Sequence, residues 1–411
     1  MVSFQPPEGD RRVDITIVGA GIVGLATARA LLRRYPALRL AVLEKEAAIC
    51  QHQTGRNSGV IHSGLYYQPG SLKARLCVEG AAAMLRYCEE RGIPFNVCGK
   101  VVVATTPAEV ERLQELYRRG TANGVVGLEM IGPERLREIE PHAVGLQALY
   151  SPNTAIVDYG RVAAAYVEDI VALGGEVLTG RAVRQIARTG RHVWVDTAAG
   201  LVETRYLIGC AGVYADRVAA LSGAPRDPRI VPFRGDYYIL KPEQRHLINA
   251  LIYPVPDPAF PFLGVHSTLR MDGTMWLGPN AVLAFGREGY CRWDVHMPDL
   301  VDAVGYAGFQ KLARKYWRTG FDEMVRDWSK QLFVAAVQRF VPAITADGVV
   351  AGPAGIRAQA LNPDGSLVDD FVFHQDGPIV HVRNAPSPAA TSSLMIGEMV
   401  ADMATNAFSL G

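Results

Sequence analysis

The sequence predicts an α/β protein in which a discontinuous, doubly wound domain is interleaved with an antiparallel-sheet domain. Three observations lead to this fold class. A strand–turn–helix unit opens the chain at residues 13–35, and a second one begins near residue 205. Between residues 230 and 277, several strand-like runs surround an Asp-Gly pair that is typical of a hairpin turn.

The wide separation of the two strand–turn–helix units indicates that each domain is assembled from distant segments. We expect the doubly wound domain to comprise residues 1–92, 146–225 and 346–411. The antiparallel domain would then comprise residues 93–145 and 226–345, with a helical segment near 285–335.

The first unit carries the pattern of a dinucleotide-binding site. A short, β-branched strand, Val13 to Val18, precedes Gly19, Gly21 and Gly24, which form the G-x-G-x-x-G motif. The first glycine allows a tight turn, the second lets a pyrophosphate approach the backbone, and the third lets the helix pack on the strand. Glu44 ends the next strand, where its carboxylate can accept hydrogen bonds from ribose hydroxyls. The motif alone leaves the choice between NAD and FAD open.

The composition of the chain excludes several classes of protein. The chain has 411 residues, of which 49% are hydrophobic, and a formal net charge of +1, so it can bury a large core and has no basic footprint for nucleic acid. The six cysteines form no C-x-x-C pair and no metal-binding spacing, so we expect reduced thiols and no metal site. No signal peptide or transmembrane run is evident, so we expect a cytoplasmic protein.

The remaining elements follow from hydrophobic periodicity and turn residues. Helices are expected at residues 71–92, 107–124, 131–141, 158–173, 283–339 and 387–408. Strands are expected at residues 100–105, 176–178, 182–186, 192–197, 201–204, 205–210, 230–240, 250–255, 262–265, 274–277, 349–356, 368–374 and 379–382.

A long polar loop, residues 51–68, contains the first candidate site. Its Gly, Ser and Thr residues between Thr54 and Gly64 would let the backbone lie flat against a planar ring, and His62 could bind that ring or act as a base. The alternative is a solvent-exposed loop histidine.

Arg357 and His266 are candidates for contacting a substrate. Arg357 follows a strand-like turn, and its planar guanidinium suits a bidentate carboxylate contact; the alternative is a surface ion pair. His266 lies beside the predicted hairpin and could act as base or carboxylate ligand; a structural histidine is the alternative.

Two further stretches have alternative interpretations. Residues 386–392 are typical of a helix start, which could stabilise negative charge on a bound cofactor or simply cap the terminal helix. The aromatic and basic residues between Trp276 and Arg318 could form a membrane-surface helix, or pack in the core.

Several motifs together resemble the L-2-hydroxyglutarate oxidase/dehydrogenase family of the D-amino-acid-oxidase-like flavoproteins. They are the N-terminal fingerprint, the loop from Thr54 to Tyr67, the stretch from Val231 to Tyr238, the run from Gly278 to Ala281, and residues 384–391. The resemblance spans essentially the whole chain and implies FAD rather than NAD.

The resemblance also implies site residues. FAD would be bound by the three motif glycines and Glu44, with the loop residues Thr54, Asn57 and Ser58, with Val183 and Gly212 at the adenine end, and with Gly355, Pro388, Ala389 and Ala390 near the flavin. Arg357 matches the carboxylate-binding arginine of related amine oxidases. His62 and His266 both match the family pattern, and the sequence does not rank them as catalytic base.

The implied reaction is oxidation of (S)-2-hydroxyglutarate to 2-oxoglutarate, with hydride transfer from C2 to flavin N5. A neutral histidine suits removal of the hydroxyl proton. Arg357 would bind one carboxylate of this small dicarboxylate, and Lys241, Tyr66 and Asn280 remain open for the other.

The resemblance further implies oxygen or a membrane quinone as electron acceptor, and with the latter a peripheral contact on the inner face of the cell membrane. The alternatives on the same fold are an amine or glycerol-3-phosphate oxidoreductase, or a flavin-binding protein without catalysis.

Overall fold

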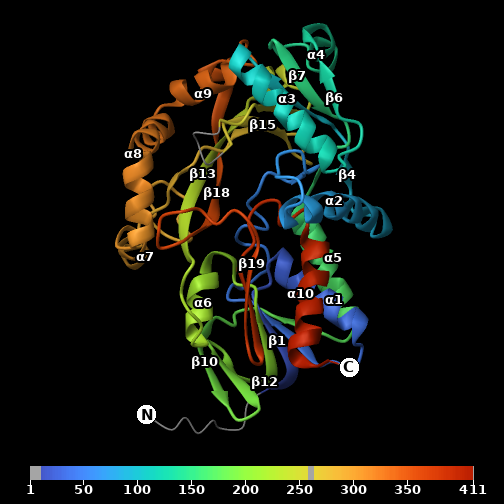
Figure 1. Ribbon diagram of the computed structural model, residues 1–411, viewed down its shortest axis with the longest axis vertical. Coiled ribbons are helices and arrows are strands. Elements are labelled where there is room, and N and C mark those ends of the chain that lie inside the picture. The colour runs from blue at the N-terminus through green and yellow to red at the C-terminus, as the bar shows by residue number, and fades with distance from the viewer. Residues whose placement is uncertain (1–10, 258–262, 411) are drawn as a thin grey trace. The chain divides into compact units, whose positions relative to one another are not determined.

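The computed structural model describes residues 11–257 and 263–410 (Figure 1). The chain forms two compact units, each assembled from separate segments. The first unit comprises the described residues of Met1–Gly55, Tyr159–Val231 and Ala358–Gly411, and the second comprises those of Arg56–Asp158 and Pro232–Arg357.

The first unit is built on an eight-stranded sheet with a parallel centre. β1 (Arg11–Val18) pairs in parallel with β2 (Leu40–Leu43) on one side and with β12 (Gly200–Gly209) on the other. These strands are buried and mostly apolar, as a parallel sheet covered by helices requires. The remaining strands are β9 (Glu176–Leu178), β10 (Val183–Thr189), β11 (His192–Thr197), β19 (Val372–Asp376) and β20 (Ile379–Asn384).

Helices of the first unit come from three distant parts of the chain. α1 (Ile22–Arg34) packs against α5 (Tyr159–Ala172) and α10 (Ser393–Phe408), which lie beside it in Figure 1. α10 can approach α1 closely because position 397 is a glycine: a Cβ there would stand only 2.7 Å from the Ala26 backbone. The short helices η1 (Gly212–Tyr214) and α6 (Ala215–Leu221) follow β12.

The second unit contains three sheets. β3 (Val60–Ile61), β8 (Ala155–Val157) and β4 (Phe95–Asn96) form the smallest. The second has the order β14-β5-β7-β6, comprising Leu251–Pro254, Lys100–Ala104, Gln147–Ser151 and Glu129–Ile131. The third contains β13 (Arg229–Leu240), β15 (His266–Leu269), β16 (Met275–Gly278), β17 (Val282–Leu283) and β18 (Val349–Leu361).

Several helices of the second unit, among them α3 (Pro107–Ala122), α4 (Pro133–Ile139) and α9 (Lys330–Gln338), share a core with these sheets. Val101, Val102, Phe333 and Phe340 are among its fully buried residues. The other helices are α2 (Leu72–Glu90), η2 (Pro242–Leu247), α7 (Met297–Val304), α8 (Ala307–Trp328) and η3 (Ala346–Gly348). None of the helices that the structure describes combines the length and hydropathy that a membrane span needs.

The boundaries of the two units differ from the expected domain limits. Residues 56–92 and 146–158 belong to the second unit, because β3 and β4 both pair with β8. Residues 226–231 belong to the first unit, and residues 346–357 to the second.

Several expected elements require correction. The strand expected at 262–265 is β15 at His266–Leu269, set by its antiparallel register with β16; Phe262 itself lies outside the described residues. The expected strand at 250–255 pairs in parallel with β5 rather than joining the β13 sheet. The two runs at 201–204 and 205–210 form one strand, β12. The helical region begins at Met297 rather than residue 283.

The C-terminal helix also begins later than expected. Residues 387–392 form turns, and α10 starts at Ser393. Pro386 and Pro388 lack a backbone N–H, and each disfavours helical geometry at the residue before it. The expected helix start at Pro388, Ala389 and Ala390 is therefore wrong.

Candidate active site

The turn between β1 and α1 requires glycine at two positions. Gly19 has φ +106°, and a Cβ there would lie 2.4 Å from the Cys210 carbonyl oxygen. A Cβ at Gly24 would lie 2.0 Å from the carbonyl oxygen of Gly19. Both distances are far below van der Waals contact, so these glycines are needed for the fold itself.

Gly21 differs, because the protein leaves space beside it. It precedes the first residue of α1 in extended conformation, and a Cβ there would meet only the Thr54 hydroxyl oxygen, at 3.6 Å. The backbone N–H of Ile22 donates to Thr54 Oγ1 at 3.0 Å. The N-terminus of α1 thus faces open space at Gly21, as expected where a phosphate approaches a helix dipole.

Glu44 directly follows β2, as the sequence predicted. One carboxylate oxygen accepts the Ala20 N–H and the other accepts the Glu46 N–H, each at 3.0 Å. A carboxylate has about four acceptor positions, so Glu44 retains capacity for ribose hydroxyls.

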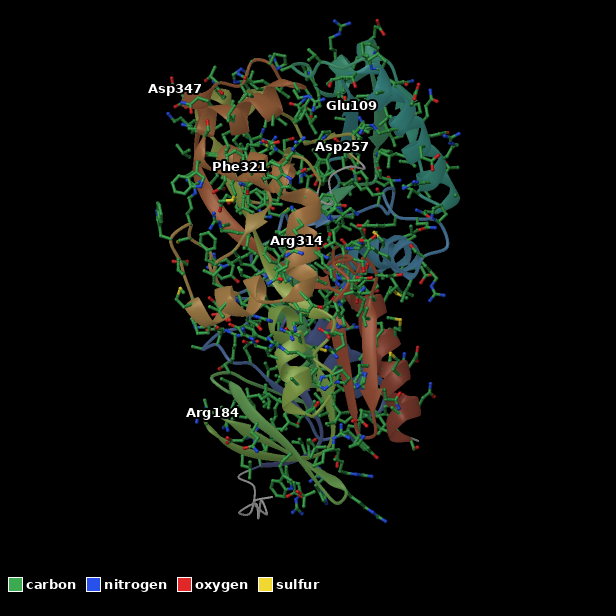
Figure 2. All side chains as sticks on the ribbon, turned by 60° about the vertical axis from the view of Figure 1, so that its left-hand side comes forward. Glu109, Arg184, Asp257, Arg314, Phe321 and Asp347 are labelled. Atoms are coloured by element: carbon green, nitrogen blue, oxygen red, sulfur yellow. The ribbon has the colours of Figure 1, made fainter. Side chains whose placement is uncertain are left out.

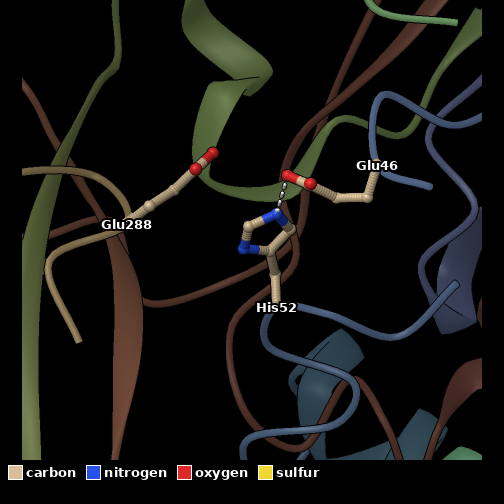
Figure 3. A group of neighbouring side chains, drawn as sticks. All are labelled: Glu46, His52 and Glu288. Carbon is tan, nitrogen blue, oxygen red and sulfur yellow. Dashed lines mark hydrogen bonds and ion pairs between the residues drawn. The ribbon is translucent and has the colours of Figure 1, made fainter. Parts of the chain in front are cut away.

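An ion-pair cluster orders the segment after Glu44. Glu46 Oε1 lies 2.9 Å from His52 Nε2 (Figure 3) and also contacts Lys45. The Lys45 and His52 partners lower the pKa of the Glu46 carboxyl. This cluster holds residues 51–54 beside the turn of the glycine motif.

A cavity of about 530 Å³ lies in the first unit at this turn. The sequence-predicted residues that line it are Gly19, Gly21, Glu44, Thr54, Val183 and Gly212. Four cations also line it, namely Lys45, Arg181, Arg184 and Arg217. Its size is within the range of small-molecule sites, and its cations suit a pyrophosphate, so these residues fit the nucleotide part of a dinucleotide. Neither spacing nor periodicity in the sequence marks these four cations as part of a site.

The other expected cofactor-binding residues do not line this cavity. Asn57 belongs to the second unit, where its side chain accepts the Gly59 N–H at 2.7 Å. Ser58 lies next to it. Gly355, on β18, permits close backbone contact, since a Cβ there would stand 2.5 Å from the Arg56 carbonyl oxygen. The turn at Pro388, Ala389 and Ala390 precedes α10.

His266 occupies the first position of β15 and is 5% exposed. Its Nδ1 lies 2.9 Å from the Gly264 carbonyl oxygen and therefore carries the proton, which leaves Nε2 as an acceptor. The ring packs on Tyr253, with centroids 3.9 Å apart. Burial, followed by the charges of Arg357 and Lys100, lowers the pKa of His266 to about 3, although its bond to Gly264 opposes the shift.

The structure brings His62 into the same neighbourhood. His62 follows β3, and burial lowers its pKa to about 3, with smaller contributions from Lys100 and His266. Both histidines are therefore neutral near pH 7. The three catalytic candidates His62, His266 and Arg357 come from distant segments of the chain yet belong to one cluster of the second unit.

Arg357 lies on β18, and its side chain is partly buried. Burial lowers the pKa of its guanidinium, and the Tyr237 and Glu323 side chains oppose that shift. Arg270 provides a further cation; it stacks on Trp276 and donates to the Asn57 carbonyl oxygen at 2.8 Å. This cluster is rich in cations, as binding of an anionic substrate requires.

Lys100, the most deeply buried cation of this cluster, was not predicted from the sequence. It opens β5 and is 1% exposed. The only signal was a lysine at the start of an otherwise apolar, β-branched strand, which on its own suggests a strand end at the surface.

Comparison with known proteins places the chain among flavoenzymes. The model of the family described as FAD dependent oxidoreductase matches residues 14–403. The chain is 50% identical to L-2-hydroxyglutarate dehydrogenase, mitochondrial, of Homo sapiens, covering 97% of this chain and 89% of that protein. It is 48% identical to the L-2-hydroxyglutarate dehydrogenase of Indibacter alkaliphilus, covering 96% and 99%.

Solved structures share the fold. L-alpha-glycerophosphate oxidase from Mycoplasma pneumoniae, with FAD bound, has a TM-score of 0.78 and 21% identity, covering 98% of this chain and 96% of that one. Glycine oxidase from Geobacillus kaustophilus has a TM-score of 0.71 and 19% identity, covering 96% and 95%. The predicted fold class and the family resemblance are thereby confirmed.

Proposed function

Because this chain belongs to the FAD dependent oxidoreductase family and its cofactor is FAD, we propose that it oxidises (S)-2-hydroxyglutarate to 2-oxoglutarate. The observation that carries this proposal is the identity of about half of all residues, over nearly the full length, with relatives of that name. The likeness to a glycerophosphate oxidase and a glycine oxidase rests on about a fifth of the residues.

The two units then have separate tasks. The cavity of the first unit would hold the adenosine and pyrophosphate parts of FAD, through Gly21, Glu44, Thr54 and the lining cations. We further assign Asn57, Ser58, Gly355 and the turn at Pro388, Ala389 and Ala390 to the flavin part. The second unit would bind the substrate at the cluster of His266, His62 and Arg357.

Each substrate-binding side chain has a role that follows from its chemistry. Arg357 would bind the carboxylate next to the hydroxyl-bearing carbon, since its planar fork matches a carboxylate bidentately. His266 would accept the hydroxyl proton at Nε2, because Nδ1 is committed to Gly264. His62 remains the alternative proton acceptor. Bound FAD supplies the two-electron acceptor for the hydrogen on C2.

The proposal is tested by mixing the purified flavoprotein anaerobically with candidate substrates and recording its visible spectrum. We expect (S)-2-hydroxyglutarate to bleach the flavin band, and sarcosine and glycerol 3-phosphate to leave it unchanged. Bleaching by either of these two compounds without bleaching by 2-hydroxyglutarate would overturn the substrate assignment. A flavin that none of the compounds bleaches would indicate a non-catalytic flavoprotein.

The electron acceptor would be oxygen or a membrane quinone. The exposed surface of α8 supports the membrane quinone. On α8, Trp317, Phe321 and Trp328 are 62%, 63% and 59% exposed. Phe321 and Arg314 on this helix are labelled in Figure 2. Basic residues on the same helix are Lys311, Arg314, Lys315 and Arg318. Exposed aromatic residues beside cations suit a membrane surface with anionic lipids.

Sedimentation with vesicles tests this contact. We expect the protein to bind vesicles containing anionic lipid, and the double variant Trp317→Ser, Phe321→Ser to bind them at least tenfold more weakly with unchanged flavin reduction. Equal vesicle binding by both proteins would remove α8 from the membrane contact and favour oxygen.

A further inference from the structure

Lys100 is a buried cation that has no anionic partner within residues 11–257 and 263–410. None of the hydrogen bonds or ion pairs found among the described residues involves its ammonium group. Instead, Nζ lies 4.8 Å from the ring centre of Tyr66 and 5.3 Å from that of Tyr253. Two aromatic faces compensate only part of the cost of burying a charge, so an unpaired ammonium here is costly unless an anion arrives.

Lys100 and Arg357 both act on His266. The two cations contribute to lowering the pKa of that histidine, which places it within reach of each. Lys100 also acts on His62, whereas Arg357 is not among the charges that shift the pKa of His62 or of Lys100. Geometry places Lys100 and His266 near each other, because Lys100 Nζ lies over the Tyr253 ring and the His266 ring packs on that same tyrosine, with centroids 3.9 Å apart. Arg357 is the second cation that acts on His266. This arrangement matches a substrate that has two carboxylates and a reacting carbon beside one of them.

Of the three side chains considered for the second carboxylate, Asn280 and Lys241 fit less well, whereas Tyr66 fits. The Asn280 amide is already engaged: its oxygen accepts the Asp236 N–H at 2.7 Å, and its nitrogen donates to Asp327 at 2.6 Å. Lys241 is not among the charges that affect either histidine. Tyr66 has a buried hydroxyl without a hydrogen-bond partner, directly beside Lys100.

We propose that Lys100, assisted by the Tyr66 hydroxyl, binds the carboxylate remote from the reacting carbon and thereby selects dicarboxylates over monocarboxylates. This inference rests on the proposed function. A carboxylate beside Lys100 keeps its ammonium protonated, so Lys100 is a binding residue and leaves proton abstraction to a histidine.

Binding of a carboxylate at Lys100 should be accompanied by proton uptake. Burial lowers the pKa of Lys100 to about 7 in the substrate-free protein, although Cys77 opposes the shift. The other titratable groups around Lys100 stay neutral between pH 6 and 9, because the pKa of both histidines is lowered to about 3 and that of the thiol and phenols is raised; they are His62, His266, Cys77, Tyr66 and Tyr253. When a carboxylate binds beside Lys100 at pH 8, the amine must therefore take up a proton from the buffer.

Calorimetry on the FAD-loaded protein tests this without any mutation. Glutarate and valerate have the same carbon chain, and neither can be oxidised at C2, so they compare two carboxylates with one. In two buffers of different ionisation enthalpy at pH 8, we expect glutarate binding to take up most of one proton and valerate binding to take up almost none. Equal proton uptake by the two ligands would overturn the proposal.

Variants assign the effect to Lys100. In Lys100→Met, we expect glutarate affinity to fall and the KM for (S)-2-hydroxyglutarate to rise, each roughly 10- to 100-fold, as for loss of a hydrogen bond between charged groups. Valerate affinity should not fall. Lys100→Arg stays charged at pH 8, so it should restore glutarate binding and abolish the proton uptake.

Lys73 provides a matched control, because it is also a buried lysine over a tyrosine ring in the second unit. Lys73→Met should preserve the preference for glutarate over valerate. A Lys100→Met protein that keeps that preference, or one that loses only the rate of flavin reduction at saturating substrate, would contradict the proposal. Should the wild type prefer glutarate through Lys100 but fail to oxidise 2-hydroxyglutarate, only the proposed function would be refuted.

Discussion

Arg357 is the residue whose loss should separate substrate binding from cofactor binding. In Arg357→Met we expect the KM for (S)-2-hydroxyglutarate to rise roughly 100-fold, corresponding to about 3 kcal/mol for a charge-assisted contact. The visible spectrum should show that FAD remains bound, because Arg357 is not among the residues lining the nucleotide cavity.

Arg357→Lys is the control for this substitution. It keeps the charge but loses the planar fork, so its KM should lie between those of the wild type and Arg357→Met. Steady-state kinetics that are unchanged in both variants would remove Arg357 from the substrate site.

The two neutral histidines should differ when each is replaced by alanine. We expect His266→Ala to slow flavin reduction at least 100-fold, within the usual range for a general base, and His62→Ala to slow it less than tenfold. Anaerobic stopped-flow measurements at saturating substrate compare the two variants. The reverse order would make His62 the base, and normal reduction in both variants would exclude both residues.

At the scale of elements, the β1–α1 turn combines glycines that the fold requires with one, Gly21, that we assign to cofactor binding. Gly24→Ser should lower the free energy of unfolding by roughly 1–3 kcal/mol, because its side chain would collide with the Gly19 carbonyl group. Gly21→Ser should leave the stability of the FAD-free protein nearly unchanged, since serine suits a helix N-cap with extended backbone.

For the FAD affinity of the folded protein, we expect the opposite order: Gly21→Ser should lose more than Gly24→Ser. A serine at position 21 would fill the space where a pyrophosphate approaches the backbone, so we expect at least a tenfold loss of FAD affinity, measured by fluorescence titration. If Gly21→Ser binds FAD as tightly as the wild type, the open space at Gly21 has another role.

At the scale of the whole molecule, each unit contains a buried, neutral histidine: His381 in the first and His266 in the second. Burial lowers the pKa of His381 to about 4 and that of His266 to about 3, both below the value near 6.5 in the unfolded chain. Between pH 6.5 and 4 the unfolded state binds more protons, so stability must fall as the pH falls.

We expect each histidine to contribute roughly 1 kcal/mol per pH unit to this loss, measured by urea unfolding at several pH values. In His381→Gln and in His266→Gln, the free energy of unfolding should fall less steeply between pH 6.5 and 4 than in the wild type. His142→Gln, at an exposed position, should leave this pH dependence unchanged. An identical pH dependence of the free energy of unfolding in all of these proteins would show that neither buried histidine causes the loss of stability in acid.

Local features of the sequence were sufficient to predict the turn between β1 and α1 and the position of Glu44 after β2. Gly19, Gly21, Gly24 and Glu44 lie within one β–α–β stretch, so hydrophobic periodicity and motif spacing determine their geometry. The start of α10 was placed too early because helix-start residues cannot be told apart from a proline-containing turn without tertiary contacts.

The sequence by itself therefore determined the α/β fold, the glycine turn and the flavoenzyme family, because these depend on neighbours along the chain. Only the tertiary structure decided which side chains meet at the substrate cluster. Lys100 lies on β5 in one sheet, whereas His266 and Arg357 lie on β15 and β18 in another, so the packing of two sheets rather than sequence spacing places them in one unit. That Lys100 is buried, and that no described carboxylate pairs with it, can be recognised only in the folded structure.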